Sequence, residues 1–451
     1  MKTKSIAAAV AALTMTAMAA VPVYASAAGT TYSTTRAEGS VDSTTLDKYL
    51  VMDADANVPN AKFTFSVAQG NAITADKTNG KLAVLKGVGT PALTNGTMAF
   101  STDDTDAAIA EAAAGTGSNT DTPVFVTTGE GKTTDEKYVK KTLTLDFSSV
   151  AFTEPGVYRY IITEAGTNQG ITNGYTGADS DTVTTRTLDV YVEDAGTTDT
   201  NGKPQLKIAG YVMYNGTQTT APKAAATNEG ETPNGAEVAG ATKNATITNV
   251  YASQDLTFGK VVTGNQGSKD KYFDFTVTIS NAVPKTKYTV DISNADPTSG
   301  ENAATIDDNK SKENVTTITV PAAAGEATTS SVTTHFYLQN GQYITIKGLA
   351  KNTGYSVSEN AEDYTSKAAN LILDNNNDVK GFTISDVTFK DAAEGTIAAE
   401  DIETGFTNDR SGTIPTGIIN TVAGSAGILA VGIAGVAGGM FYLKKKKNED
   451  E

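Results

Sequence analysis

The sequence predicts an all-β protein made of two tandem immunoglobulin-like, antiparallel β-sandwich domains. The first observation is a set of short stretches in which apolar and polar residues alternate, rich in Thr, Val, Tyr and Phe, as in half-buried strands. The second is that clusters of Gly, Asn, Asp and Thr interrupt them about every ten residues, as turns do in a sandwich. The clearest strand-like stretches are 61–68, 141–152, 156–164, 186–193, 272–279, 316–320 and 342–349.

The number of strand-like residues predicts two domains. The pattern extends from about residue 42 to residue 408, and about 370 residues are too many for one sandwich. Outside the two ends of the chain, helical periodicity is weak, and residues 103–115 are expected to form at most a short helix in a connecting loop. The first domain is expected to carry the larger loops, for example at 211–241.

An internal repeat places the division near Tyr251. Each half contains a lysine on an early strand, a Phe-x-Phe strand, a Tyr-x-(Ile/Val)-x-Glu strand and a closing strand that ends in Thr-Asn. Lys48 precedes Phe63 by 15 residues, and Lys260 precedes Phe273 by 13. The repeat elements are 46–51, 63–67, 156–164 and 245–249 in the first half, and 256–262, 273–277, 354–359 and 405–408 in the second.

The N-terminal end reads as a secretory signal peptide. Lys2 and Lys4 precede an apolar stretch from Ile6 to Val23, and small residues follow in Val-Tyr-Ala-Ser-Ala-Ala-Gly, as at a signal cleavage site. We therefore expect residues 1–27 to be removed after export. The predicted mature domains are residues 28–250 and residues 251–411.

The C-terminal segment 412–451 has three parts. Thr413, Ile414, Pro415, Thr416 and Gly417 form a Thr-Ile-Pro-Thr-Gly sequence. An uncharged run from Ile418 to Leu443 follows, longer than the about 20 residues that cross a bilayer. Four lysines, 444–447, come next, as on the cytoplasmic side of a span.

This three-part ending resembles the sorting signal of Gram-positive surface proteins. It departs from the common Leu-Pro-x-Thr-Gly pentapeptide by a one-residue shift and is closer to the x-Val-Pro-Thr-Gly form of certain streptococcal major pilins. The resemblance implies that a sortase cysteine attacks the Thr416–Gly417 bond and passes the Thr416 acyl group to an amine. The span would then hold a precursor in the membrane only until the protein is joined to the cell wall.

Composition excludes several classes of function. The whole chain carries a formal charge of −16, and residues 28–416 carry −19, because the removed ends hold six lysines against three acids. Such a surface disfavours nucleic acid and anionic lipid as partners. There is no cysteine and one histidine, His335, so no dense metal site or cofactor and no ordinary nucleophilic triad is expected.

The repeat places a lysine, a glutamate and an asparagine among apolar neighbours. Because side chains i and i+2 share a strand face, Lys48 points with Leu46 and Leu50, and Glu164 points with Tyr160 and Ile162. By the same alternation Asn249 lies with its apolar neighbour two residues before it. The corresponding residues of the second half are Lys260, Glu359 and Asn408. Burial lowers the pKa of a lysine and raises that of a glutamate, so a neutral amine could attack the asparagine amide while the acid moves protons.

The same residues resemble the intramolecular isopeptide sites of the streptococcal major pilin family. The resemblance implies a Lys48–Asn249 bond assisted by Glu164 and a Lys260–Asn408 bond assisted by Glu359, each tying the first strand of a domain to its last. The glutamates would be catalytic only in this self-crosslinking, so no enzyme activity toward other molecules is expected. Lys62, Lys269 and Lys271 are alternative lysines.

The resemblance also implies polymerisation and partners. A class C-type sortase would join Thr416 to a lysine of an identical subunit, and a housekeeping sortase would link the pilus to peptidoglycan. No Tyr-Pro-Lys pilin motif is present. Lys243, six residues before Asn249, is the first choice of acceptor and Lys223 the second. Minor pilins and host ligands are further partners that the sequence leaves open, as is a shaft, base or tip role.

Two other functions stay open. A monomeric wall-anchored adhesin or stalk built from the same domains is the alternative, and an extracellular hydrolase is the third reading. Residues 374–381 begin like a calcium loop, but they lack the turn glycine, and Ser385 stands where a bidentate glutamate belongs. A hairpin turn suits this segment better.

Overall fold

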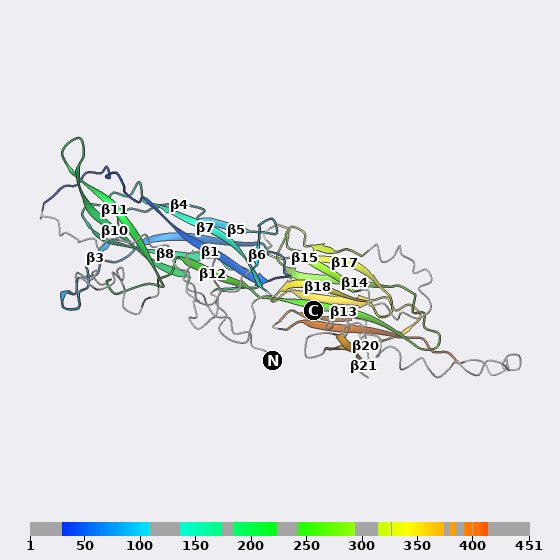
Figure 1. Cartoon of the computed structure of the whole chain (residues 1–451). Coiled ribbons are helices and arrows are strands. Elements are labelled where there is room, and N and C mark those ends of the chain that lie inside the picture. Colours follow the sequence, from blue (N-terminus) through cyan, green and yellow to red (C-terminus); the bar gives the residue numbers. More distant parts are fainter. Residues whose placement is uncertain are drawn as a thin grey trace, which may run out of the picture. The chain divides into compact units, whose positions relative to one another are not determined.

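In the structure, a computed structural model, nearly all of the regular secondary structure of the described residues is β-strand (Figure 1). The structure describes residues 29–108, 136–173, 184–222, 241, 243–293, 314–325, 327–373, 379–384, 392–398 and 400–413. Within these ranges the helical content is one short 3₁₀ turn, η1 (Lys77–Asn79). The all-β prediction is therefore confirmed.

The chain divides into two compact units. The first comprises Met1–Ala54 and Ala61–Tyr251, and the second comprises Asp55–Asn60 and Ala252–Glu451. The predicted domain limits at residues 27, 250 and 411 stay predictions.

Unit 1 contains two sheets. In the first, the strand order is β4-β7-β1-β12-β9, with β6 also paired to β7. Its strands are β1 (Ser43–Asp53), β4 (Ala92–Thr94), β6 (Ala107–Ala108), β7 (Glu136–Asp146), β9 (Ile171–Asn173) and β12 (Thr246–Tyr251). In the second, the order is β11-β10-β8-β2-β5, with β3 paired to β8. Its strands are β2 (Ala61–Gln69), β3 (Val84–Lys86), β5 (Thr97–Phe100), β8 (Gly156–Ala165), β10 (Thr185–Thr198) and β11 (Pro204–Asn215).

Unit 2 has the same two-sheet plan. Its larger sheet has the order β16-β15-β18-β13-β23-β20-β21, and its smaller sheet the order β17-β14-β19-β22. The larger sheet contains β13 (Ser253–Thr263), β15 (Lys287–Ser293), β16 (Thr317–Thr319), β18 (Tyr343–Ala350), β20 (Thr365–Leu373), β21 (Val379–Ile384) and β23 (Ile402–Asp409). The smaller contains β14 (Phe273–Ala282), β17 (Ser330–Leu338), β19 (Gly354–Glu359) and β22 (Ala392–Thr396).

The alternation in the sequence explains the packing of these strands. In β14, buried and half-exposed residues alternate over most of the strand, and β2 begins in the same way. The buried sides of the two sheets of unit 2 meet in one core, where Phe275 of β14 packs against Phe258 of β13 and Phe406 of β23. In unit 1, Phe147, just after β7, packs in the same way against Tyr160 of β8.

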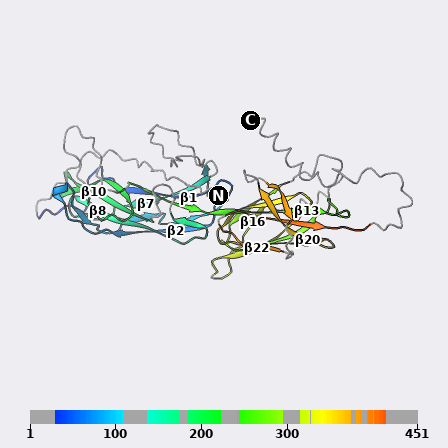
Figure 2. The ribbon, with the colours of Figure 1, turned by 90° about the horizontal axis from the view of Figure 1, so that it is seen from below.

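The ladders are mostly antiparallel, but the first and last strands of each unit run parallel. β1 pairs with β12 in unit 1, and β13 pairs with β23 in unit 2 (Figure 1). β3 and β8 are a further parallel pair. The prediction of antiparallel sandwiches therefore holds for the remaining pairings, such as β1 with β7, which lie next to each other in the turned view of Figure 2. The parallel pairing is the feature that brings the two ends of each unit together.

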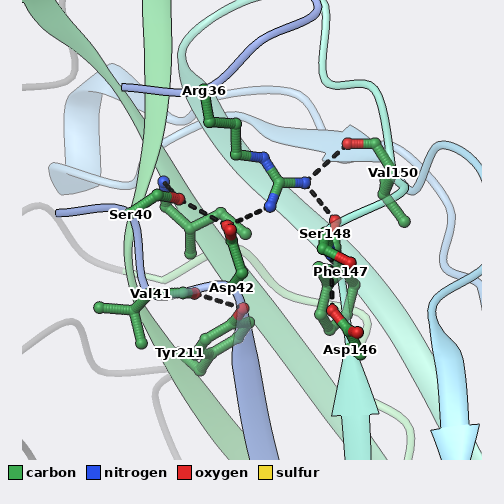
Figure 3. Close-up of polar contacts among 10 residues, drawn as sticks. Arg36, Ser40, Val41, Asp42, Asp146, Phe147, Ser148, Val150 and Tyr211 are labelled. Carbon is green, nitrogen blue, oxygen red and sulfur yellow. Dashed lines mark hydrogen bonds and ion pairs between the residues drawn. The ribbon is translucent and has the colours of Figure 1, made fainter. Parts of the chain in front are cut away.

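A segment ahead of β1 is fixed to unit 1 by Arg36 (Figure 3). The guanidinium forms an ion pair with Asp42 and donates to the backbone carbonyls of Phe147 and Val150, the latter at 2.7 Å. Nearby, the Tyr211 hydroxyl donates to the carbonyl of Val41 at 2.7 Å. This network orders the chain where it enters β1, the strand that carries Lys48.

Three local predictions can be compared with the structure. The first residues of the predicted 103–115 helix form a turn and the short strand β6 instead, and residues 109–115 lie outside the described part. The predicted 211–241 loop begins too early, because β11 continues to Asn215, and most of the remainder is not described. Of the predicted hairpin turn at 374–381, residues 374–378 lie outside the described part, and residues 379–381 belong to β21, which pairs antiparallel with β20.

Candidate functional site: a buried lysine, glutamate and asparagine in each unit

Three strands bring the polar residues of the repeat together in unit 1. Lys48 lies on β1 and Asn249 on the neighbouring strand β12, whereas Glu164 lies on β8 in the facing sheet. Gly166 directly follows β8 and lies beside β2: its φ is 139°, and a Cβ there would lie 2.5 Å from the carbonyl oxygen of Lys62. Only glycine fits that turn without strain.

The three side chains of unit 1 are in contact. Lys48 Nζ lies 2.8 Å from Glu164 Oε2 and 2.5 Å from Asn249 Oδ1. The residues are 0%, 5% and 1% exposed, respectively. The burial that strand alternation predicts is therefore confirmed in this unit, and the amine meets both the acid and the amide oxygen.

Unit 2 repeats this arrangement in the same register. In unit 1, Asn249 pairs with Leu50, two residues after the lysine; in unit 2, Asn408 pairs with Val262, two residues after Lys260. The glutamates also correspond, because Glu164 and Glu359 each pair with the second phenylalanine of the Phe-x-Phe strand. The internal repeat in the sequence is thus a repeat of strand register.

The contacts within unit 2 differ in detail. Lys260 Nζ forms an ion pair with Glu359 Oε1, and Asn408 Nδ2 donates to the same oxygen at 3.0 Å. Lys260 and Asn408 are fully buried, and Glu359 is 9% exposed. One carboxylate oxygen therefore contacts both the amine and the amide nitrogen.

An aromatic ring lies beneath each amine. Lys48 Nζ is 4.2 Å from the centroid of Phe63, and Lys260 Nζ is 4.1 Å from that of Phe273. Both are the first phenylalanine of their Phe-x-Phe strand. A ring face attracts a cation and excludes water from it, so these residues define one wall of each site, a role the sequence pattern alone did not assign.

Burial shifts the protonation of these groups. It lowers the pKa of Lys48 to about 8, although Glu164 opposes this shift. Burial likewise lowers the pKa of Lys260 to about 8 and raises the pKa of Glu359, with each partner opposing the other's shift. In unit 2 the proton affinities of Lys260 and Glu359 are therefore closer than in water, which favours transfer of a proton from one to the other.

Several polar atoms of the unit 2 site lack hydrogen bonds. Lys260 Nζ, Glu359 Oε2 and Asn408 Oδ1 are buried and make no hydrogen bond within the described part of the chain, although the lysine keeps its ion pair. Buried polar atoms without hydrogen bonds cost free energy. A nucleophilic amine, a carboxyl group and an amide carbonyl in contact can exchange one amide for another, with loss of ammonia.

The alternative lysines do not enter either site. Lys62 and Lys269 are exposed, and Lys271 forms an ion pair with Glu362 near the surface. His335 is also at the surface, where Nδ1 lies 2.9 Å from Asp274. No group of three potential metal ligands occurs among the residues that the structure describes.

Two residues next to the first site were missed by the sequence analysis. Asn173 on β9 accepts a hydrogen bond from Asn249 Nδ2 at 3.1 Å. Arg186 on β10 is fully buried, donates through Nε to the carbonyl of Thr246 at 2.9 Å, and contributes to the lowered pKa of Lys48. Neither belongs to the internal repeat, so the pattern that identified the site could not include them.

A buried ion pair outside the two lysine sites was also missed. Arg159 on β8 and Asp189 on β10 are 1% and 0% exposed and form two parallel contacts of 2.7 Å. Arg159 Nη1 also donates to the carbonyls of Gln218 and Thr220. This pair lies apart from the lysine site and fixes the loop after β11 onto its sheet.

Most of the predicted sorting and acceptor residues cannot be placed. Thr413 is exposed at the end of the described chain, whereas Ile414 to Gly417 and Lys223 lie outside the described residues, as do the signal peptide and the span. Lys243 is half-buried and forms a backbone bridge with Tyr214. Among the described residues no helix is long and apolar enough to cross a membrane.

Comparisons with known proteins place this chain near streptococcal pilins in sequence. A family model described as "Domain of unknown function (DUF7601)" matches residues 254–410. "Pilin" of Streptococcus pyogenes serotype M1 is 26% identical over 311 residues, covering 68% of this chain and 72% of that protein. The crystal structure of the major pilin from Streptococcus pyogenes matches with 19% identity and a TM-score of 0.43, over 82% of this chain and 99% of that one. A pilus-presented adhesin matches with 15% identity and a TM-score of 0.23, over 50% of this chain and 36% of its own. The chain is thus similar in sequence to a streptococcal pilin over 68% of its length, which confirms the resemblance predicted from its motifs.

Proposed function

We propose that this protein is a structural subunit of a covalently polymerised cell-surface pilus, with each unit locked by a self-formed lysine–asparagine isopeptide bond. The observation that carries the proposal is the contact of Lys48 with both Glu164 and Asn249 inside a folded sandwich. Similarity to a streptococcal pilin supports the same conclusion.

The chemistry of the first bond follows from these contacts. The neutral amine of Lys48 attacks Cγ of Asn249, so that an Nζ–Cγ bond forms and the Cγ–Nδ2 bond breaks. Glu164 takes a proton from the amine and returns it to the leaving nitrogen, and ammonia departs. The products are one secondary amide and ammonia, with no external reactant. Holding the groups in contact replaces a bimolecular encounter, which is worth a large effective molarity, about 10⁵ M or more.

Burial supplies part of the driving force. Before reaction each site holds an amine and a carboxyl group away from water, which is costly when hydrogen bonds are missing. Condensation removes the amine as a titratable group and leaves a neutral amide. We expect Lys260, Glu359 and Asn408 to react in the same way, with Glu359 Oε1 next to both nitrogens.

The position of the bonds suits a filament under tension. Each would join the first strand of its unit to the last, and these strands are parallel neighbours in one sheet. A load that enters at one strand and leaves at the other would then pass through a covalent bond instead of through ladder hydrogen bonds.

Polymerisation would use the C-terminal motif. A class C-type sortase would cleave Thr416–Gly417 and join Thr416 to Lys243 of the next subunit, and a housekeeping sortase would attach the finished pilus to peptidoglycan. The precursor would be exported, held in the membrane and then displayed at the cell surface.

The experiment that tests this function is an immunoblot of the cell-wall fraction after boiling in SDS. A ladder of high-mass species is expected from the wild type. Thr416→Ala should abolish the ladder and leave the protein in the membrane fraction. A single wild-type band near monomer mass would contradict the pilus proposal and favour a monomeric wall-anchored protein.

A further inference from the structure

The two sites differ at the amide nitrogen that must leave. In unit 2, Asn408 Nδ2 donates to the carboxylate of Glu359 at 3.0 Å. In unit 1, Asn249 Nδ2 donates instead to Asn173 Oδ1, at 3.1 Å, while Asn249 Oδ1 accepts from Lys48. In unit 1 a neutral side chain, Asn173, therefore accepts the hydrogen bond from the amide nitrogen that Glu359 accepts in unit 2.

Strand register explains the difference. Asn173 lies on β9, the edge strand next to β12, directly opposite Asn249. In unit 2, β20 is the neighbour of β23, and Ser366 stands opposite Asn408. Ser366 has a shorter side chain than asparagine and carries no amide group. Asn408 directs its amide nitrogen to Glu359 instead.

Exposure gives Asn173 a second property. Asn249 is 1% exposed, whereas Asn173 lies at the surface. The hydrogen bond between them therefore joins the buried leaving group to a residue in contact with solvent.

We propose that Asn173 is a positioning residue for the Lys48–Asn249 bond, a role that rests on the proposed self-crosslinking. It holds the Asn249 amide with its oxygen toward the lysine and its nitrogen toward the surface. The opposite orientation would place the Asn249 amide N–H groups against the amine, two donors in contact. Asn173 is neutral and transfers no proton; Glu164 carries the proton from Nζ to Nδ2.

The proposal is tested by measuring the two bonds separately in one molecule. The protein is made in a short cell-free synthesis pulse, samples are denatured at intervals, and tryptic peptides are quantified by mass spectrometry. Asn173→Ala should slow the Lys48–Asn249 bond about tenfold, which is about 1.4 kcal/mol of barrier. Asn173→Asp, which keeps an acceptor oxygen, should restore the rate. Ser366→Ala, the matched change in unit 2, should leave the Lys260–Asn408 bond unaffected.

A purely structural role is separated by a second measurement. In a Lys48→Met/Asn249→Leu background, which cannot form the first bond and has no amide for Asn173 to hold, Asn173→Ala should leave the melting temperature unchanged. A wild-type rate for Asn173→Ala, or a slow rate accompanied by a lower melting temperature in the bond-free background, would overturn the positioning role. Absence of both bonds from the wild type would instead refute the proposed self-crosslinking itself.

Discussion

Replacing Glu164 by glutamine should prevent the first isopeptide bond while keeping the shape of the site. Gln has nearly the volume of Glu but cannot carry a proton from Lys48 Nζ to the leaving nitrogen of Asn249, so the amide does not lose ammonia. The Lys260–Asn408 bond in unit 2 should still form. The variant should therefore be about 17 Da heavier than the wild type, apart from the substitution itself, because one ammonia is retained.

The loss of stability can be worked from the structure. Lys48 and Asn249 are 201 residues apart, and a covalent tie that closes a loop of about that length restricts the unfolded chain by about 5 kcal/mol at 25 °C, by analogy with disulfides. For a unit of this size each kcal/mol corresponds to about 2–4 °C in melting temperature. Unit 1 should therefore melt about 10–20 °C lower, and the unpaired Lys48 left in the core adds to the loss.

Calorimetry of purified wild type and variant provides the assay, with intact mass measured on the same samples. The control is the double variant Lys48→Met/Glu164→Leu, which also lacks the bond but buries no charge. It should lose the contribution of the tie alone and melt above Glu164→Gln. A Glu164→Gln protein with wild-type mass, or one that lacks the bond yet melts at the wild-type temperature, would refute the reasoning.

Three further predictions concern the protonation of Lys48, the Arg159–Asp189 ion pair and polymerisation. In Asn249→Ala, which cannot condense, burial lowers the pKa of Lys48 from 10.5 to about 8. Between those pH values the unfolded chain binds more protons than the folded one, so the free energy of unfolding, measured by urea titration, should rise by a few kcal/mol from pH 8 to pH 10.5. In the crosslinked wild type this lysine no longer titrates, so it should contribute no such rise. Arg159→Met should cost about 3–5 kcal/mol in urea unfolding because it leaves the Asp189 carboxylate buried without its partner, and adding Asp189→Leu should recover most of that loss. Lys243→Ala should abolish the high-mass ladder on a blot but leave the monomer folded and cleaved at its C-terminus; a persisting ladder would show that another lysine is the acceptor.

Much of the site was predictable because strand alternation fixes which side chains enter the core. Lys48, Glu164 and Asn249 share faces with apolar residues in the sequence, and all three are buried in contact. The repeat added the correspondence with unit 2. What alternation could not supply was the pairing partner of each strand, so the parallel arrangement of β1 with β12 was not foreseen.

The missed residues have physical reasons of their own. Arg159 alternates with Tyr158 and Tyr160 on β8, which predicts a solvent-facing side chain. It is buried because loops cover the outer face of its sheet: a Cβ on Gly70 would lie 2.6 Å from Arg159 Cγ, and Arg159 donates to the carbonyl of Gln218. A strand pattern does not reveal which loops fold back over it.

Asn173 was missed for a different reason. It lies on a three-residue edge strand, too short to show alternation, and its importance comes only from standing opposite Asn249. Short edge strands of this kind become visible only when their partner is known.

The most direct test of the account is the intact mass of recombinant residues 28–416, purified in folded form without any sortase. Two self-formed bonds predict a mass about 34 Da below the sequence value, one ammonia for each bond. Tryptic mapping should then find the peptides of Lys48 and Asn249 joined, and likewise those of Lys260 and Asn408. A well-folded sample with the unmodified mass would contradict the account and leave two sandwiches held by packing and buried ion pairs alone.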